Sequence, residues 1–344
     1  MDKKFDVVIG NPPYQGETVG DSTSAPPIYP QFMDAAHEIG SKSVLITPAR
    51  FLFNAGYTSR LWNEKMLADE HLSAPIYVPN SNTLFPGTDI KGGVAVTYRD
   101  SDRKLGPITV FAKYAEISSI MDKVDASGAN SFADLITKRD AFKYTQKMHN
   151  DHPSAEALMS NSAKYIIVAN AFDKVSFLFT QNKPDSSDEY VQIVGLSEAK
   201  RVSRWVRREY ISGPSNFNRY RVMIAAANGS GQLGESLSTP TVLDPDVAVT
   251  ATFLTIGAFK EKRDAEACLK YVKTKFARTM LGVLKVTQHN PAKVWKFVPA
   301  QDFSSTSNIN WSQSVAEIDR QLYKEYKLSD TEINFLESNV KAME

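Results

Sequence analysis

The sequence has very little of what builds a disulfide framework or a zinc site. It contains one cysteine, Cys268, and five scattered histidines. A disulfide needs a second cysteine, and a structural zinc site needs several Cys or His ligands at close, regular spacing. These absences exclude a disulfide-rich scaffold and a Cys/His zinc protein, and we expect no metal site.

Long apolar runs and a strong net charge are also lacking. No apolar run approaches the ~18 residues that a membrane span needs, and no apolar signal-peptide core follows Met1. We therefore expect a cytoplasmic protein that does not cross a membrane. With 42% hydrophobic and 23% charged residues, the 344-residue chain has the composition of globular domains and is long enough for two of them.

The formal net charge of +1 conceals a basic middle region. Residues 198–296 contain 17 Lys or Arg against 8 Asp or Glu. Such a region predicts a local surface for a polyanion, although a solvated basic face gives the same composition.

The first hundred residues alternate between strand and helix patterns. Strands are predicted at 5–10, 43–47, 74–78 and 93–98, and helices at 29–39 and 58–70. Continuous apolar runs such as residues 44–46 fit strands that are covered on both faces, as in parallel sheets. The pattern therefore predicts an α/β domain.

The pattern changes beyond a Ser/Asn-rich patch at residues 127–131. Mixed strands (163–169, 175–180, 190–194, 221–226, 250–256) and helices (197–210, 262–284) follow a strand at 108–114, and residues 313–342 form a polar helical tail. We predict three parts: residues 1–125, 126–300 and 301–344.

A distinctive segment, Asn11-Pro12-Pro13-Tyr14, directly follows the first predicted strand; we call these residues 11–14 the NPPY segment. The two prolines fix two φ angles and keep Asn11 extended. Acceptors on both N–H bonds of a conjugated amino group, here the Asn11 side-chain oxygen and the Pro12 carbonyl, would favour a pyramidal nitrogen whose lone pair faces an incoming methyl group. Tyr14 would stack on a base rotated out of the duplex. The alternative is a Pro-rich turn after a buried strand.

Residues 5–15 resemble motif IV of the N6-adenine DNA methyltransferases. The segments IYPQF (28–32), LITPARFL (45–52) and LFPGTDIKGGV (84–94) follow in an order similar to the later motifs of the gamma-class enzymes of type IIG and type I-like restriction-modification systems. The tail, with WSQSV at 311–315, is also similar to that family. The resemblance implies the second half of a Rossmann-like methyltransferase sheet, then a mixed α+β target-recognition domain and a helical tail.

The resemblance also implies roles for individual residues. Asn11 and Pro12, with Pro13 in the same motif, would hold the target amino group, and Tyr14 would stack on the flipped adenine. Phe85, in the matching Phe-Pro-Gly segment, would contact the base from another side, although a core aromatic residue after a turn is the plain alternative. The implied activity is site-specific adenine-N6 methylation of double-stranded DNA, with S-adenosylmethionine as donor.

The cofactor-binding half of such an enzyme is missing from the sequence. In this family a Gly-rich turn and an acidic residue on the first strands hold S-adenosylmethionine, at a crevice beyond the carboxyl ends of the strands. Only ten residues precede Asn11. We expect a complementing chain, or a longer product, to supply this half, and the cofactor-binding residues stay unknown. The alternative is a catalytically inactive DNA-binding remnant or specificity module.

Two other patterns imitate known sites. Residues 229–234 read Gly-x-Gly-x-x-Gly, but a Ser/Thr/Pro-rich segment follows in place of a helix, so we interpret them as a loop. Asp185, Glu198 and Lys200 imitate the metal-binding pattern of restriction nucleases. The nuclease pattern needs its Glu and Lys on a strand, whereas Ser197 is predicted to be the N-cap of a helix that contains Glu198 and Lys200. We therefore do not expect nuclease activity.

The predicted helix at 197–210 carries the strongest basic signal. Its spacing places Val202, Trp205 and Val206 on an apolar stripe, with Arg201, Arg204 and Arg208 together on a polar face. We expect this face, with Lys200 and Arg219, to contact DNA phosphates within the target-recognition domain. A solvated helix face is the alternative.

Overall fold

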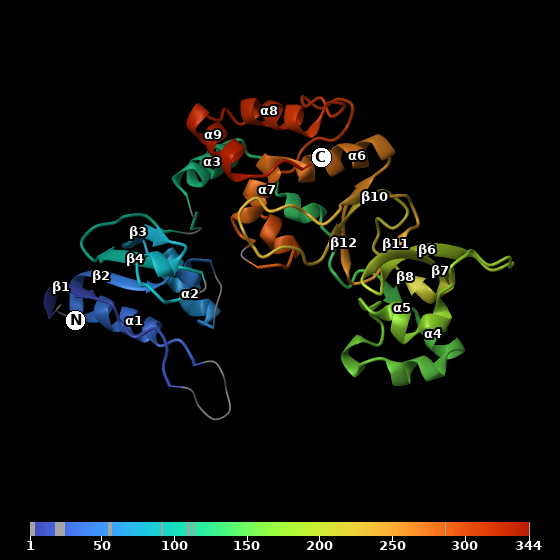
Figure 1. The fold of residues 1–344 in the computed structure, drawn as a ribbon, viewed down its shortest axis with the longest axis horizontal. Coiled ribbons are helices and arrows are strands. Elements are labelled where there is room, and N and C mark those ends of the chain that lie inside the picture. The colour runs from blue at the N-terminus through green and yellow to red at the C-terminus, as the bar shows by residue number, and fades with distance from the viewer. Residues whose placement is uncertain are drawn as a thin grey trace. The chain divides into compact units, whose positions relative to one another are not determined.

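The computed structural model describes residues 4–17, 25–53, 57–90, 92–108, 111–112, 114–285 and 287–343. Two compact units make up the chain, unit 1 (Met1–Tyr114) and unit 2 (Ala115–Glu344) (Figure 1). Each unit combines helices with strands, which confirms a mixed α/β protein. The finer division into residues 1–125, 126–300 and 301–344 stays a prediction. None of the helices in the described ranges is long and apolar enough to span a bilayer.

Unit 1 contains a four-stranded sheet in the order β1-β2-β4-β3. Its strands are β1 (Phe5–Gly10), β2 (Gly40–Pro48), β3 (Leu72–Val78) and β4 (Val94–Asp100). β1 and β2 are parallel, whereas β4 is antiparallel to both of its neighbours. A parallel pairing of β3 and β4 would need a crossover helix, and the described residues between them form no helix beyond the short turn η2 (Ser81–Thr83).

One face of this sheet is covered by α1 (Tyr29–Ile39), η1 (Ala49–Phe53) and α2 (Arg60–Ala68). Tyr29, Met33 and Ala36 recur at helical spacing and are buried against Leu45 and Phe51. Burial of each large apolar side chain contributes roughly 1.5 to 3 kcal/mol. The predicted helix at 29–39 is confirmed.

The opposite face of the sheet is open. Phe5, Val7 and Ile9 alternate along β1 and keep 56%, 48% and 76% of their surface exposed. Strand register places further apolar residues on the same face, and together these side chains form what we call the open face: Phe5, Val7, Ile9, Val44, Ile46, Ile76, Val96 and Tyr98. The expectation that both faces are covered is therefore wrong for the described part of the chain.

Unit 2 is built around two hydrophobic clusters. The first packs the sheet β10-β9-β12 against α3, α6, α7, α8 and α9, with Tyr271 and Trp295 fully buried at its centre. These elements are β9 (Tyr220–Ala225), β10 (Thr241–Leu243), β12 (Phe253–Phe259), α3 (Ala115–Ala126), α6 (Lys262–Lys273), α7 (Lys275–Gly282), α8 (Val315–Glu325) and α9 (Asp330–Asn339). The tail helices α8 and α9 thus share a core with α6 and α7.

The second cluster lies under the sheet β11-β6-β7 and includes Phe172, Ile193 and Val206. Its elements are α4 (Gln146–Asp151), α5 (Ala171–Lys174), β5 (Lys143–Tyr144), β6 (Tyr190–Ser197), β7 (Lys200–Arg207), β8 (Ile211–Ser212) and β11 (Ala248–Val249). The described part of unit 2 also contains six short 3-10 turns: Phe132–Leu135, Pro153–Leu158, Asn161–Ala163, Ser176–Leu178, Arg208–Tyr210 and Ala292–Trp295. The predicted strands at 163–169 and 175–180 are wrong, because these segments form turns and isolated bridges.

The predicted helix at 197–210 is also wrong. Residues 190–207 form an antiparallel hairpin in which β6 and β7 pair from Tyr190 and Arg207 to Ser197 and Lys200. Glu198 and Ala199 make the two-residue turn with positive φ angles of 50° and 60°. Pairing with β6 buries Val206 opposite Val191, and this tertiary burial outweighs the helical spacing of the apolar residues.

Two other predicted elements differ from the structure. The helix predicted at 262–284 is interrupted at Thr274, whose extended backbone ends α6 and whose side chain caps α7 by accepting a hydrogen bond from the Ala277 N–H. The strand predicted at 108–114 falls partly outside the described residues, and its described residues are not in a strand.

Candidate functional site

The NPPY segment leaves the sheet at the carboxyl end of β1. Gly10 pairs with Leu45 in the parallel register, so Asn11 emerges at the same edge as Pro48, the last residue of β2. Asn11 is exposed, and within the described part of the chain no hydrogen bond engages its side-chain amide. Its oxygen is therefore free to accept a hydrogen bond from a ligand.

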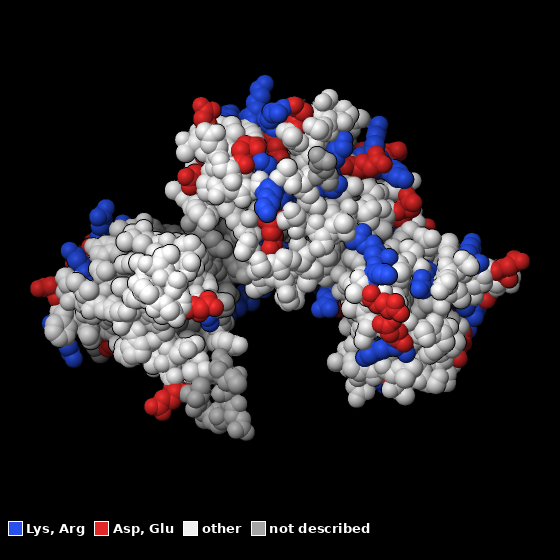
Figure 2. All heavy atoms as spheres, in the orientation of Figure 1, with Lys and Arg blue, Asp and Glu red and all other residues white. Residues whose placement is uncertain are grey.

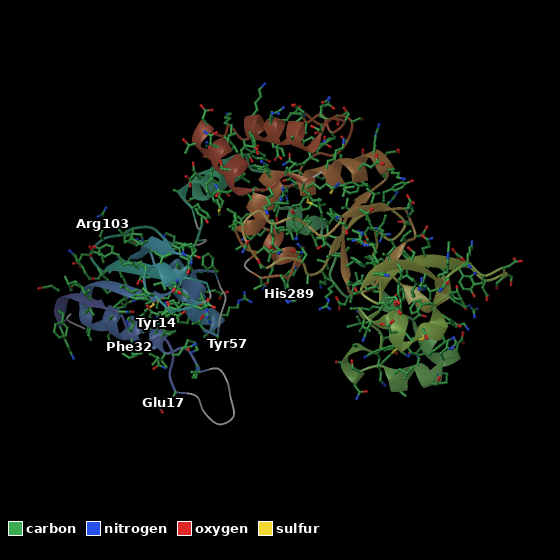
Figure 3. The ribbon with its side chains drawn as sticks, in the orientation of Figure 1. Tyr14, Glu17, Phe32, Tyr57, Arg103 and His289 are labelled. Carbon is green, nitrogen blue, oxygen red and sulfur yellow. The ribbon has the colours of Figure 1, made fainter. Side chains whose placement is uncertain are left out.

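A cavity of about 130 Å³ opens beside this segment. Tyr14, Tyr29 and Tyr57 form aromatic walls, and Figure 3 labels Tyr14 and Tyr57 on unit 1. The described lining consists of Tyr14, Gln15, Ala25, Pro27, Tyr29, Pro48, Arg50, Tyr57, Thr58, Asp89 and Ile90. Flat aromatic and proline walls with a few polar groups are suited to a planar heterocyclic ligand.

The half-buried Tyr14 and the buried Tyr29 of the cavity both keep neutral hydroxyl groups. Burial raises the pKa of Tyr14, and it raises the pKa of Tyr29 to about 12 even though the nearby Thr58 hydroxyl and the Arg50 charge oppose the shift. The Tyr14 hydroxyl is buried without a hydrogen-bond partner among the described residues. A buried hydroxyl without a partner is costly, which suits a position that a ligand completes.

Backbone hydrogen bonds tie the end of the NPPY segment to the start of α1. The Ile28 N–H donates to the Tyr14 carbonyl at 3.2 Å, and the Gly16 N–H donates to the Pro26 carbonyl at 2.9 Å. Gln15 forms an isolated bridge with Pro27. These contacts hold Tyr14 against the helix that contributes Tyr29 to the cavity.

Phe85 lies in the loop between β3 and β4. It is partly buried, its N–H donates to the Ser81 carbonyl at 2.8 Å, and it is not among the described residues that line the cavity. Asp89 and Ile90 of the same loop do line it, and the sequence reasoning passed over them although they belong to the segment that carries the resemblance. Tyr57 was missed as well, because a lone aromatic residue between two predicted elements carries no signal.

The Gly-x-Gly-x-x-Gly loop at 229–234 holds a carboxylate of the protein itself. Glu235 accepts hydrogen bonds from the Ser230 N–H at 2.7 Å and from the Gly231 N–H at 3.1 Å, and it pairs with the buried Lys285. Burial alone would raise the pKa of Glu235, but the Lys285 bond and these N–H groups lower it. Because these N–H groups already have an anionic partner, the loop does not fit a cofactor phosphate or carboxylate.

The nuclease-like pattern is not assembled into a metal site. Glu198 lies in the hairpin turn and Lys200 begins β7, so the helix that served to exclude nuclease activity does not exist. Within the described ranges, no three His, Cys, Asp or Glu side chains are grouped so that they could hold a metal ion.

The predicted arginine face does not exist as a helix face. Because side chains alternate along a strand, Arg201 and Arg204 of β7 lie on opposite faces of the hairpin. Arg201 donates to the Thr239 hydroxyl at 2.8 Å and stacks on Phe253, whereas Arg204 lies over Phe172.

Arg208 follows β7 in a short 3-10 turn, where it donates to the Ile211 carbonyl at 2.9 Å and stacks on a phenylalanine ring. Lys200 and Arg219 are exposed. On the face drawn in Figure 2, basic and acidic side chains are interspersed over this part of unit 2. Arg207, for example, pairs with Asp188 at 3.1 Å and with Glu209 at 2.6 Å. A role of these arginines in DNA binding stays a prediction.

Two restriction enzymes are among the solved structures that align with this chain. The type IIG restriction endonuclease BpuSI aligns with 97% of this chain and 53% of its own at a TM-score of 0.38 and 10% identity. The type IIL restriction-modification enzyme MmeI, solved in complex with DNA, aligns with 97% of this chain and 56% of its own at a TM-score of 0.38 and 12% identity.

Sequence comparison gives a more specific likeness. An uncharacterized adenine-specific methylase of Mycoplasma pneumoniae is 24% identical over 151 residues, which are 43% of this chain and 35% of that protein. The chain thus spans about a third of the length of this curated relative. Residues 1–85, which contain the NPPY segment, match the family described as Eco57I restriction-modification methylase. The resemblance predicted from the motifs is therefore confirmed: residues 1–85 are similar to a restriction-modification methylase family, and part of the chain is similar to an uncharacterized adenine-specific methylase.

Proposed function

We propose that this chain is the target-base half, joined to the DNA-recognition part, of an adenine-N6 DNA methyltransferase of a restriction-modification system. The observation that carries the proposal is the position of the NPPY segment, at the carboxyl end of β1 and beside the tyrosine-lined cavity. Open α/β sheets bind their ligands beyond the carboxyl ends of the strands. The match of residues 1–85 to a restriction-modification methylase family supports the proposal.

In the proposed reaction a flipped adenine enters the cavity. Its ring stacks on Tyr14, and its amino group donates hydrogen bonds to the Asn11 side-chain oxygen and the Pro12 carbonyl, with Pro13 keeping the turn rigid. These acceptors stabilise the pyramidal nitrogen of the transition state more than the flat nitrogen of the ground state, so they act on the rate. Phe85 would contact the base only after the loop between β3 and β4 brings it to the cavity.

The proposed methyl donor is S-adenosylmethionine, which supplies an electrophilic methyl group. The described residues fit it only in part. The exposed Asn11 lies at a sheet edge that could form one wall of a cofactor crevice, but the only Gly-x-Gly-x-x-Gly loop of the sequence already binds Glu235. We therefore propose that the chain methylates DNA when a complementing polypeptide provides the opposite wall.

Asn11→Ala tests this function. In the complemented enzyme we expect the methyl-transfer rate to fall by about 100-fold or more, because the variant loses one of two acceptors that act mainly in the transition state. Single-turnover transfer of radioactive methyl groups to DNA measures this rate, and DNA affinity should stay unchanged. Gln31→Ala, at an exposed position of α1, is the matched control.

A near-normal rate for Asn11→Ala would show that the NPPY segment is only a structural turn. If the complemented wild-type enzyme transfers no methyl group but still binds DNA, the alternative of a catalytically inactive DNA-binding remnant or specificity module holds instead.

A further inference from the structure

Two hydroxyl groups of the tyrosine-lined cavity are not engaged by the protein itself. The hydroxyl groups of Tyr29 and Thr58 are buried, and neither forms a hydrogen bond with any of the described residues. Both residues line the cavity beside the NPPY segment. They lie close to each other, because the Thr58 hydroxyl is near enough to oppose the rise in the pKa of Tyr29. We call these two groups the hydroxyl pair.

The packing of unit 1 fixes the position of both groups. Tyr29 is 2% exposed, and its ring centroid lies 6.3 Å from that of Phe51 and 6.0 Å from that of Trp62. Thr58 directly precedes Ser59, the N-cap residue of α2. Side chains that are held in this way lose little further freedom when a ligand binds to them. The hydroxyl pair is therefore prepared for a ligand before the ligand arrives.

A buried hydroxyl group without a protein partner needs an explanation. Buried polar groups of native proteins nearly always have a partner, and a group without one lowers stability. Phenylalanine and valine would fill the same space as Tyr29 and Thr58 without a polar atom. Because no protein group is bound to the two hydroxyls, a ligand can bind them without breaking a hydrogen bond of the protein. A polar edge of a ligand is the partner that these groups fit.

We propose that the hydroxyl pair selects the flipped base by its edge. The Tyr29 hydroxyl donates a hydrogen bond to a ring nitrogen next to the amino group of adenine, and the Thr58 hydroxyl donates to the Tyr29 oxygen and orients it. Tyr29 is thus a specificity-determining residue and Thr58 a positioning residue, whereas Asn11 and Pro12 act on the amino group. The identity of the ligand as adenine rests on the proposed function, and the place of its polar edge rests on the geometry of the cavity.

The other two tyrosines of the cavity are less suited to read the edge of the base. A tyrosine that stacks on the base, as proposed for Tyr14, keeps its hydroxyl above the plane of the base, whereas the lone pairs of the ring nitrogens lie in that plane. Tyr57 is 76% exposed, so water competes for its hydroxyl. Tyr29 and Thr58 come from the start of α1 and from the residue before the N-cap of α2, and both are buried.

A donor next to the amino group distinguishes adenine from the other bases. The amino group of adenine has a ring nitrogen that accepts a hydrogen bond on each side, N1 on one and N7 on the other. Cytosine has such a nitrogen on one side of its amino group only. Guanine and thymine carry a carbonyl oxygen at the corresponding position, which the acceptors Asn11 and Pro12 would repel. Two acceptors and one adjacent donor therefore match the pattern of adenine.

The test is nucleoside binding to the full chain, without DNA or methyl donor. Ligand-detected NMR titration measures the affinities of deoxyadenosine, 1-deaza-deoxyadenosine and 7-deaza-deoxyadenosine. With the wild type we expect one of the two analogues to bind about 5-fold more weakly than deoxyadenosine, because a C–H group replaces the accepting nitrogen. The analogue that binds more weakly identifies the ring nitrogen that Tyr29 contacts.

Two variants remove the hydroxyl groups one at a time. Tyr29→Phe should weaken the binding of deoxyadenosine by about 5-fold and leave the binding of the weaker analogue unchanged, because that hydrogen bond is already absent. Thr58→Val should give the same pattern with a smaller effect, since it acts through Tyr29. Neither variant should lower the melting temperature, because each removes a buried hydroxyl that has no partner among the described residues.

Tyr144→Phe and Thr279→Val are the matched controls. Their hydroxyl groups are also buried without a hydrogen-bond partner among the described residues, but they belong to unit 2. Both controls should bind all three nucleosides as the wild type does.

Three results would overturn the proposal. The first is a wild-type chain that does not distinguish deoxyadenosine from either analogue, and the second is a Tyr29→Phe variant that weakens the binding of all three nucleosides equally or lowers the melting temperature. The third is S-adenosylhomocysteine that displaces deoxyadenosine, because the cavity would then belong to the methyl donor.

This test and the test of the proposed function can fail separately. If the nucleosides bind as expected but the complemented enzyme transfers no methyl group, only the proposed function is contradicted. If Asn11→Ala lowers the rate of methyl transfer but the nucleosides are not distinguished, only the role of the hydroxyl pair is contradicted.

Discussion

Asp319 is a carboxylic acid buried between two helices of unit 2. It keeps 3% of its surface exposed, and its carboxyl oxygens accept hydrogen bonds from the Lys275 and Phe276 N–H groups at the start of α7. Burial raises the pKa of Asp319 to about 6, although these two N–H groups and Arg278 oppose the shift. The charged form is therefore costly in the folded state, while the hydrogen bonds fix the junction between α7 and α8.

This pKa predicts how stability depends on pH. The folded state holds the Asp319 proton more tightly than the unfolded chain does. The contribution of this bound proton to the free energy of unfolding is therefore fully present below about pH 4, and it is lost as the pH rises to about 6. Asp319→Asn removes this titration and adds a pH-independent cost, because the amide group can accept only one of the two N–H bonds.

We expect the free energy of unfolding of the wild type to fall, relative to Asp319→Asn, by up to about 3 kcal/mol between pH 4 and pH 6.5. Urea denaturation of both proteins across this range measures the difference, in which the titration of most other groups cancels. A difference that stays constant with pH would show that Asp319 titrates normally.

At the scale of elements, the β6–β7 hairpin has an unusual turn. Two-residue hairpin loops of this kind need positive φ at both central positions and favour Asn-Gly, because these residues adopt the left-handed region at low cost. This hairpin has Glu198 and Ala199 there, with φ angles of 50° and 60°. Each non-glycine residue in this region costs roughly 1 kcal/mol.

Replacing Glu198-Ala199 by Asn-Gly should therefore raise the free energy of unfolding by about 1 kcal/mol, measured by chemical denaturation. The same pair introduced at Asp185 and Ser186, where the structure has no positive φ, should bring no gain. A turn variant that is no more stable than the wild type would mean that the conformation of the turn is not strained.

The hairpin also changes the prediction for DNA binding. Arg201 and Arg204 lie on opposite faces of β7. A DNA duplex bound to one face of the strand can therefore contact only one of the two side chains. Of the single variants Arg201→Ala and Arg204→Ala, one should reduce the slope of log affinity against log salt by roughly 0.9, and the other should leave it unchanged. Fluorescence anisotropy at several salt concentrations measures both slopes, with Ser203→Ala as an uncharged control on the face of Arg201. Equal effects, or none, would remove this strand from the DNA surface.

At the scale of the whole molecule, the sequence was most informative in unit 1. The strands and helices of residues 5–100 could be predicted because the apolar residues of each element recur at the spacing of a strand or of a helix. Prolines also mark the ends of several of these elements. The NPPY segment could be predicted because a rigid turn after a strand is a local property. The tyrosine-lined cavity could not, because Tyr57 and Asp89 come together only when α1, η1 and the loop before β4 pack on the same sheet edge.

Unit 2 was harder to predict for a physical reason. Val202, Trp205 and Val206 have spacings that suit a helix as well as a strand, and only the pairing of β7 with β6 decides between them. The distant partners of buried charges carry no local signal either. Glu235 meets Lys285 across 50 positions of sequence, and Asp319 reaches the start of α7 across 44.

The open face of unit 1 also affects the steady-state amount of this protein in a cell. An apolar strand edge without a partner is a template for aggregation, and cellular chaperones and proteases act on chains that display one. We therefore expect the steady-state amount of the chain to depend on how far this face stays exposed, and not on the rate of synthesis alone.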